Sequence, residues 1–458
     1  MISPFVNING VGFVKKENKL DRNNVESILT LTSMQKKMLL SYIRDDRSDI
    51  YHEQLSLTIR GDMKIDILKT SWQAVIENNE MLRTVFRWKE ISKPVQIVLK
   101  KHEVPVLYMD FSEEEDKMNA IENIKFQDIT NRIDITRETL RIYLCKMDDF
   151  THEMIISNHH ILFDGWSNGI ILKELMEVYS SLYEGKVHKR LYKTKFNEFI
   201  KFLNSKNEDD EKAYWSDYLK NIDNSNDYFS CDEKGRIKEI SYKINVNKTL
   251  RMKEFAKENR VLLSSMLYGV WGVLLQKLSN SNEILFGTTV SGRPENIKDV
   301  DNMVGLFINT IPLVVKTDND TTFIELIQSL DKALNERKNY ENTSLFDIKE
   351  NCGLSNCEEL FNSVVIIENY PLDFNSNKKM TLAIDAFSII EKFDYNMVLQ
   401  VLTFDDFELK FIFNSEAIDN EIVKKLGNYY EIILNILLKN PFINIEDVDF
   451  ILEVSRTN

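Results

Sequence analysis

Apolar and polar residues follow one another in segments that predict strands and helices in turn. Residues 54–62 alternate with the period of two that is typical of a half-buried strand, and residues 64–79 carry apolar side chains at helical spacing. Residues 86–101 return to a strand-like pattern. The early part of the chain is therefore predicted to be α+β structure.

A second part of the chain repeats this plan after a polar, charged stretch at residues 204–239. It opens with a predicted strand at 239–246 and a helix at 248–260, followed by a very apolar helix at 264–278 and a strand at 283–290. We expect an N-terminal leader at 1–26, a first lobe at 27–203, a connection at 204–239 and a second lobe at 240–458.

Two segments suggest that the lobes arose by duplication. Residues 151–179 and 406–430 both read as a strand, a short loop containing Asp and an amphipathic helix. When Asp164 is matched to Asp419, His159 and His160 fall opposite Asn and Ser. One copy would then have kept its imidazoles, although an unrelated strand-loop-helix resemblance is the alternative.

Composition narrows the class of protein. With 458 residues, of which 43% are apolar, the chain can bury a large core and suits two domains. Its 58 Lys+Arg against 72 Asp+Glu argue against nucleic acid as a partner. The apolar runs fall short of the roughly 20 residues that cross a bilayer, and the N-terminus lacks a secretory pattern, so we expect a cytoplasmic protein without a membrane partner. The four cysteines are expected to be ordinary thiols: Cys145, Cys231, Cys352 and Cys357.

Candidate chemistry lies in the stretch IISNHHILFDGWSNG, residues 155–169. A predicted strand leads into a loop that carries two adjacent histidines, and loops at strand ends often hold reactive groups. Imidazole can exchange a proton near neutral pH. Asp164 could orient an imidazole or pair with a distant Arg, while Ser167 is expected to cap the following helix and Gly185 to end it. The alternative is a solvated loop or a satisfied pair of core histidines.

The string HHILFDGWS resembles the His-His-three residues-Asp-Gly signature of condensation domains in nonribosomal peptide synthetases. These domains are a branch of the chloramphenicol-acetyltransferase-like acyltransferases. Other segments resemble further motifs of the family in the right order: TLTSMQKKMLL (30–40), NNEMLRTVFRW (78–88), TTVSGRP (288–294), MVGLFINTIP (303–312) and FNSVVIIENYP (361–371). Asn78 and Asn79 depart from the usual Arg-His of the second motif, whereas Arg83 is kept.

The resemblance implies an α+β fold of two chloramphenicol-acetyltransferase-like α/β-sandwich lobes, which form a V-shaped pseudo-dimer with a central tunnel. A donor carrier protein would present an aminoacyl or peptidyl phosphopantetheine thioester, and the amine on an acceptor peptidyl carrier protein would attack it. Adjacent synthetase domains or an upstream subunit are further implied partners. The leader could carry a docking element for such a subunit, with a disordered or packed-back extension as the alternative. The sequence shows no phosphate loop, metal-ligand cluster or nucleophile elbow, so we expect no cofactor beyond the carriers' phosphopantetheine arms.

By the same resemblance, His160 is the residue nearest the chemistry, as a general base or as a group that holds the amine and stabilises the charged intermediate. His159 is expected to turn inward and hold the loop. Asp164 is expected to form an ion pair with Arg293, with capping of its own turn as the alternative. Gly165 would keep the tunnel clear.

Substrate contacts are also implied by the resemblance. Trp166 and Ser167 are expected to line the donor side. Arg83 and Asn309 are further candidates, although a plain strand-end Asn is an alternative for the latter.

Several functional alternatives stay open. Motif forms such as TSMQKKMLL, PVQIVLK, VGLFINTIP and YENTSLFDI look closer to the branch that takes a D-configured donor than to the all-L branch. A catalytically silent recruitment module is a second class of function, but such modules usually lose His160 or Gly165. A free-standing coenzyme A-dependent acyltransferase is a third, although the Asp-Phe-Gly-Trp-Gly element of the plant branch is absent.

Overall fold

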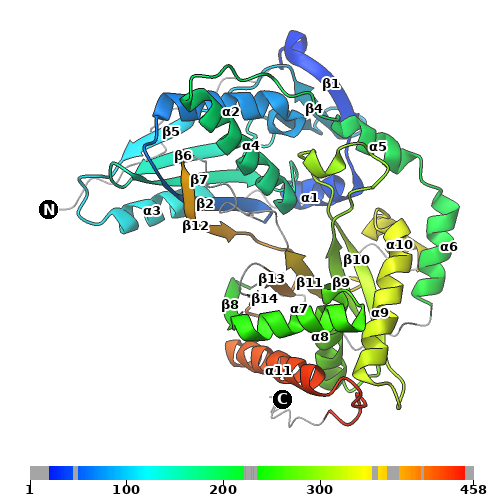
Figure 1. Ribbon diagram of the computed structural model, residues 1–458. Coiled ribbons are helices and arrows are strands. Elements are labelled where there is room, and N and C mark those ends of the chain that lie inside the picture. The colour runs from blue at the N-terminus through cyan, green and yellow to red at the C-terminus, as the bar shows by residue number, and fades with distance from the viewer. Residues whose placement is uncertain are drawn as a thin grey trace. The chain divides into compact units, whose positions relative to one another are not determined.

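The chain forms two compact α+β units in a computed structural model (Figure 1). The structure describes residues 20–44, 50–220, 222, 228–229, 231, 235–352, 359–368, 381–403 and 407–448. The first unit comprises Met1–Ser205, Arg293–Phe307 and Tyr370–Phe393, and the second comprises Lys206–Gly292, Ile308–Asn369 and Asp394–Asn458. The α+β class expected from the sequence is confirmed, and each unit includes segments that are distant in the chain.

The first unit is built on a five-stranded sheet of order β12-β2-β7-β6-β5 and a three-stranded sheet of order β1-β4-β3. The strands of the larger sheet are β2 (His52–Arg60), β5 (Val106–Asp110), β6 (Arg141–Lys146), β7 (Thr151–His159) and β12 (Ala383–Ile390). The smaller sheet has β1 (Val25–Thr30), β3 (Thr84–Arg87) and β4 (Val95–Leu99). The helices and short turns are η2 (Arg22–Asn24), α1 (Ser33–Arg44), α2 (Ile65–Asn78), η3 (Glu80–Arg83), α3 (Lys117–Thr130), α4 (Gly165–Tyr183), α5 (Phe196–Asn204) and η4 (Val300–Asn302).

The alternation of side chains along β2 separates the two faces of the larger sheet. Gln54 donates a hydrogen bond to Asp128 on α3, whereas its neighbour Glu53 accepts one from Asn168 on α4. Successive side chains of a strand point to opposite faces, so α3 and α4 cover opposite sides of this sheet. Helices α2 and α4 pack against each other (Figure 1).

The segment 86–101, which the sequence predicts as strand-like, is interrupted in the structure. Strands β3 and β4 form an antiparallel pair in which Arg87 lies opposite Val95. The residues between them are largely exposed, and Glu90 adopts a left-handed φ of 58°. The polar run KEISKP turns the chain here, because Pro94 cannot donate to a strand ladder.

The second unit is built on a six-stranded sheet of order β10-β9-β11-β13-β14-β8. Its strands are β8 (Ile237–Ile244), β9 (Glu283–Val290), β10 (Asn309–Lys316), β11 (Ser363–Glu368), β13 (Met397–Leu402) and β14 (Phe407–Asn414). Its helices and short turn are α6 (Glu208–Tyr218), α7 (Val246–Asn259), α8 (Leu263–Ser279), α9 (Phe323–Arg337), η5 (Lys338–Tyr340), α10 (Leu345–Asn351) and α11 (Asn420–Lys439). The very apolar segment 264–278 is α8, which is buried against α9 and α11.

The two units share one strand topology. In the first, β2, β7 and β6 are antiparallel neighbours and β5 lies parallel to β6. In the second, β8, β14 and β13 are antiparallel neighbours and β11 lies parallel to β13. Strands β7 and β14 end at His159 and Asn414, and the next helix is capped five residues later by Asp164 and Asp419 respectively. This correspondence supports the predicted duplication.

Some predictions concern residues outside the described part of the chain. These are most of the leader, at residues 1–19, together with Cys357, Tyr370 and Pro371. Cys145 and Cys352 are free thiols. Among the described helices, none is long and apolar enough to cross a bilayer by itself, and α7 and α8 pass that test only as a pair bent by 106°.

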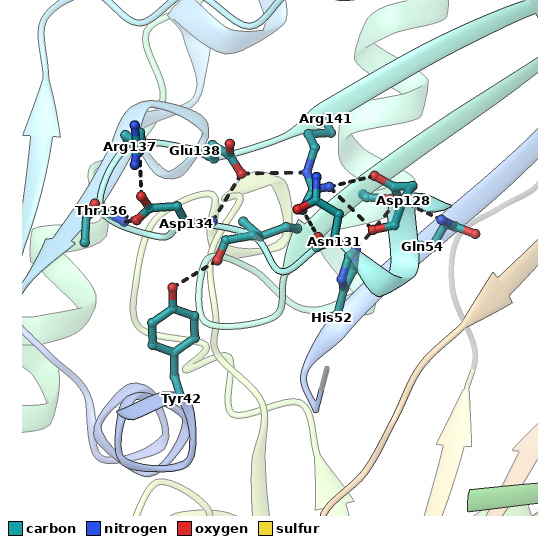
Figure 2. A network of polar contacts seen from close by, with 12 residues as sticks. Tyr42, His52, Gln54, Asp128, Asn131, Asp134, Thr136, Arg137, Glu138 and Arg141 are labelled. Carbon is teal, nitrogen blue, oxygen red and sulfur yellow. Dashed lines mark hydrogen bonds and ion pairs between the residues drawn. The ribbon is translucent and has the colours of Figure 1, made fainter. Parts of the chain in front are cut away.

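A buried ionic network lies between α3 and the five-stranded sheet of the first unit, as Figure 2 shows. The Asp128 carboxylate accepts hydrogen bonds from Gln54 at 2.7 Å, from Arg141 at 3.1 Å and from the hydroxyl of Ser157. His52 lies beside it, with Nε2 at 3.8 Å from Oδ2. Asp128 and Arg141 are both buried, so their charges compensate each other, and Glu138 gives Arg141 a second carboxylate at 3.7 Å.

Replacing Asp128 with Asn should lower the free energy of unfolding by about 3 kcal/mol, because the buried Arg141 guanidinium loses its nearer counter-ion and keeps only Glu138, whose Oε2 lies 3.7 Å from Nε. Chemical denaturation followed by tryptophan fluorescence measures this change. The control is Glu122→Gln, which removes an exposed partner of Lys125 and should cost less than about 1 kcal/mol. Equal small losses in both variants would contradict the assignment.

Candidate functional site

The paired histidines lie at the end of a central strand. His159 is the last residue of β7 and lies opposite His52 of β2, and His160 follows directly. The backbone N–H of His160 donates to the carbonyl of Tyr51 at 2.8 Å, so the pairing of the two strands extends past the end of β7. Adjacent side chains in extended backbone point to opposite faces, so the two imidazoles have different surroundings.

His159 is a buried neutral group. Its Nδ1 accepts the N–H of Ile161 at 3.1 Å, and its ring meets the edge of Tyr42 with the ring centroids 5.4 Å apart. Burial, with smaller contributions from nearby positive charges, lowers the pKa of His159 to about 3. The imidazole therefore stays uncharged near neutral pH and holds the loop through Ile161, which is the inward position expected from the sequence.

His160 presents one basic nitrogen. Its Nδ1 lies 2.9 Å from the carbonyl oxygen of Phe163. Because a carbonyl can only accept, Nδ1 must carry the proton, and Nε2 then holds the lone pair in the neutral ring. The side chain is 9% exposed. The short loop that follows β7 thus determines the tautomer and orientation of the imidazole.

A buried carboxylate lies next to this nitrogen. Oε2 of Glu53 is 4.0 Å from Nε2 of His160, and Oε1 accepts the side-chain N–H of Asn168 at 2.5 Å. Burial raises the pKa of Glu53, and the His160 and Asn168 contacts oppose this only in part.

Glu53 was not among the residues predicted from the sequence. The sequence did contain a signal for this residue. Glu53 occupies the same alternating positions of β2 as Leu55, Leu57 and Ile59, which are all buried. An acid at an apolar position of a strand is unusual and marks a candidate functional residue.

The helix after the loop begins earlier than the sequence predicted. Ser167 was expected to cap it, but the N-cap is Asp164, whose Oδ1 accepts the N–H of Ser167 at 3.1 Å and its hydroxyl at 2.8 Å. Ser167 stands at the third helical position, the usual donor to a capping side chain. Helix α4 ends at Tyr183, and Gly185 follows with φ +74°.

Asp164 also forms the ion pair with Arg293 that the resemblance implies. The Arg293 Nη2 to Asp164 Oδ1 distance is 3.1 Å, and Oδ2 accepts the N–H of Phe307 at 3.0 Å. The guanidinium also donates to the carbonyls of Val300 and Met303 and lies over the Phe307 ring. Since Asp164 is fully buried, this carboxylate ties the histidine loop to the segment 293–307.

The flanking residues of the motif have structural contacts. Gly165 is the first residue of α4 and is buried. Trp166 is partly exposed and its Nε1 donates to the carbonyl of Asp301 at 3.1 Å. Ser167, expected on the donor side, is fully buried, and its hydroxyl is occupied by Asp164 and by the N–H of Gly305.

The two remaining candidates are buried as well. Arg83 donates to Glu26 at 2.6 Å and to the carbonyl of Leu99, and neither contact belongs to the histidine loop. Asn309 belongs to the second unit and donates to the carbonyls of Glu341 and Thr343 at 2.9 and 2.6 Å. The substrate contacts expected of these two residues stay predictions.

One group of side chains in the described part of the chain has the spacing of a cation site. Glu53, His160 and Glu391 each contribute one atom, and these atoms lie within 4.8 Å of one another. Two are buried and Glu391 is half-buried. The sequence had predicted no metal ligand cluster, because these residues are far apart in the chain.

Known proteins resemble this chain in sequence. A family model described as "Condensation domain" matches residues 25–458. Tyrocidine synthase 2 of Brevibacillus parabrevis is 30% identical over 449 residues, which cover 95% of this chain and 12% of the relative. Gramicidin S synthase 2 of Aneurinibacillus migulanus is 30% identical over 445 residues, 93% of this chain and 10% of the relative. The chain thus spans about a tenth of the length of these relatives.

Solved structures agree on the fold. The first condensation domain of the calcium-dependent antibiotic synthetase, in complex with a substrate analogue, superposes with a TM-score of 0.78 at 16% identity, covering 93% of this chain and 99% of that one. A four-domain nonribosomal peptide synthetase bound to AMP and glycine gives a TM-score of 0.76 at 16% identity, covering 94% of this chain and 35% of that one. The match along the chain confirms the resemblance seen in its motifs. The chain belongs to the condensation-domain family of nonribosomal peptide synthetases, whose standard function is the formation of peptide bonds.

Proposed function

We propose that this chain joins the amine of a carrier-bound acceptor aminoacyl group to a carrier-bound donor aminoacyl or peptidyl thioester. The observation that carries the proposal is the state of His160, whose Nδ1–H is held by Phe163 while Nε2 remains basic. An imidazole oriented in this way can accept a proton from an attacking amine.

The proton balance of the reaction uses that nitrogen. The acceptor ammonium gives one proton to Nε2 of His160, and the neutral amine attacks the thioester carbonyl to form a tetrahedral intermediate. The C–S bond then breaks, and the second proton of the attacking nitrogen neutralises the departing thiolate. The carbonyl of Phe163 accepts from Nδ1–H throughout and therefore stabilises the imidazolium.

Two properties of the substrates also lower the barrier to the reaction. The thioester is already activated, and the phosphopantetheine arms of the donor and acceptor carrier proteins would hold the two reactants in register. We propose that these arms are the only prosthetic groups required and that neighbouring synthetase domains supply the carriers.

Asp164 acts as a positioning residue in this scheme. Its backbone N–H donates to the carbonyl of Gly305, and its carboxylate binds Arg293 and Phe307. These contacts hold the loop that orients His160, because Phe163 directly precedes Asp164. Loss of this anchor would loosen the imidazole without removing it.

Replacing His160 with Ala should lower kcat about 10²- to 10⁴-fold, the usual cost of removing a positioned acid-base group. The measurement is mass spectrometry of the acceptor arm after mixing donor-loaded and acceptor-loaded carriers. His188→Ala is the control, because His188 lies beyond α4 and contacts Asn78.

Two outcomes of this assay would contradict the proposal. Amide formation at full speed by the His160→Ala variant would remove the histidine from the mechanism. Product from free coenzyme A thioesters and small amines, but not from loaded carriers, would indicate a free-standing acyltransferase.

Replacing Asp164 with Asn should cost about 3 to 5 kcal/mol of unfolding free energy, because the buried Arg293 guanidinium loses its ion pair with the Asp164 carboxylate. The matched control is Asp419→Asn at the corresponding cap of α11, where the side chain is exposed and the cost should stay below about 1 kcal/mol. Thermal or urea unfolding compares the two. A loss at position 164 no larger than that at position 419 would refute the role of the ion pair.

We further propose a D-configured donor, on the basis of the motif forms in the sequence. A D-aminoacyl donor should be condensed at least about tenfold faster than its L-isomer, equivalent to about 1.4 kcal/mol in the barrier. Parallel reactions of the purified protein with D- and L-loaded donor carriers measure this ratio. Faster reaction of the L-donor would place the chain in the all-L branch.

A further inference from the structure

The sheet of the first unit brings a second carboxylate next to Glu53. Strand β2 lies between β7 and β12, with Glu53 opposite Asn158 and Gln54 opposite Ile390. Glu391 directly follows the last residue of β12, and continuing the same register by one residue sets it opposite Glu53. Residues directly opposite each other in antiparallel strands share a face. The short distances between the side-chain atoms of Glu53, His160 and Glu391, all within 4.8 Å, agree with this placement on one face.

Burial of the Glu53 carboxylate opposes the stability of the fold. Glu53 is 1% exposed, and its Oε2 accepts no hydrogen bond, whereas Oε1 is satisfied by Asn168. A buried acceptor without a hydrogen bond calls for an explanation, and a bound water, ion or ligand that supplies the missing donor is one of them. Burial accordingly raises the pKa of Glu53, and a cation beside Oε2 would oppose that shift.

The spacing of the three acceptors suits an ammonium group. A tetrahedral –NH₃⁺ with hydrogen bonds of about 2.8 Å directs its donors to acceptors about 4.6 Å apart. The atoms of Glu53, His160 and Glu391 lie within 4.8 Å of one another, and the Glu53 to His160 separation is 4.0 Å. Zinc with ligands at about 2.0 Å would need separations of about 3.3 Å, so this separation is wide for a tetrahedral metal site.

We propose that Glu53 and Glu391 bind the α-ammonium of the acceptor aminoacyl group and present it to Nε2 of His160. This inference rests on the proposed condensation function and assigns the acceptor-binding residues of the same site. After the ammonium gives its proton to His160, the Glu53 carboxylate remains 4.0 Å from the imidazolium and stabilises its charge. The cluster thus selects acceptors that carry a free amine.

A binding experiment tests this assignment without turnover. The probes are an aminoacyl pantetheine amide, which cannot react as a thioester, and its deamino counterpart, which lacks only the α-ammonium. Isothermal titration calorimetry in the absence of donor gives the ratio of their Kd values. Wild-type protein should prefer the amine-bearing probe.

The two variants are Glu53→Gln and Glu391→Gln. Each should weaken binding of the amine-bearing probe about 10- to 100-fold, the range expected for losing one hydrogen bond to a charged group, and should leave the deamino probe unchanged. Glu174→Gln is the matched control, since Glu174 is a buried carboxylate on α4 that binds Asn78. It should alter neither Kd.

The outcomes separate the inference from the proposed function. An unchanged preference for the amine in both variants would overturn the role of the carboxylates, even if the wild-type protein forms amide from loaded carriers. Absence of amide from the wild-type protein, with the preference lost in the variants, would contradict the condensation reaction alone. Loss of the preference with EDTA and its return with Zn²⁺ would show that a metal occupies the cluster.

Discussion

The buried carboxylate of Asp164 is the constraint on which the site depends. A carboxylate with no exposed surface must be compensated, and Asp164 finds its partners in Arg293, the backbone N–H of Phe307 and the first turn of α4. Satisfying one charge therefore fixes three segments at once. These contacts hold the loop between β7 and α4, and the carbonyl of Phe163 in that loop orients His160.

The duplicated topology explains why only one loop carries this chemistry. Both units place an N-capping Asp five residues after the end of the equivalent strand, at Asp164 and Asp419. The second copy has Asn414 at the strand end and an exposed cap, so its loop keeps the turn without the imidazoles or the buried charge. The same loop fold can therefore occur with or without the histidines.

The candidate site was predictable to the extent that it is local in sequence. Adjacent histidines, a strand before them and a helix after them can be read from residues 155–169. The cap was misplaced at Ser167, because Ser and Asp are both good caps and only the hydrogen bonds show which of them accepts. Glu391 was beyond prediction, since its approach to Glu53 depends on strand β12 joining an early sheet.

The sequence by itself determined the α+β plan, the histidine motif and the family, because these depend on periodicity and on side chains close together in the chain. Tertiary structure decided that His159 is a buried neutral group, whereas Nδ1 of the neighbouring His160 is held by a carbonyl and its Nε2 keeps the lone pair. The two rings differ because adjacent side chains point to opposite faces of the sheet and meet different groups there. Tertiary structure also decided which carboxylates meet at Nε2. Pairing between distant strands brings those groups together, and no local pattern encodes that pairing.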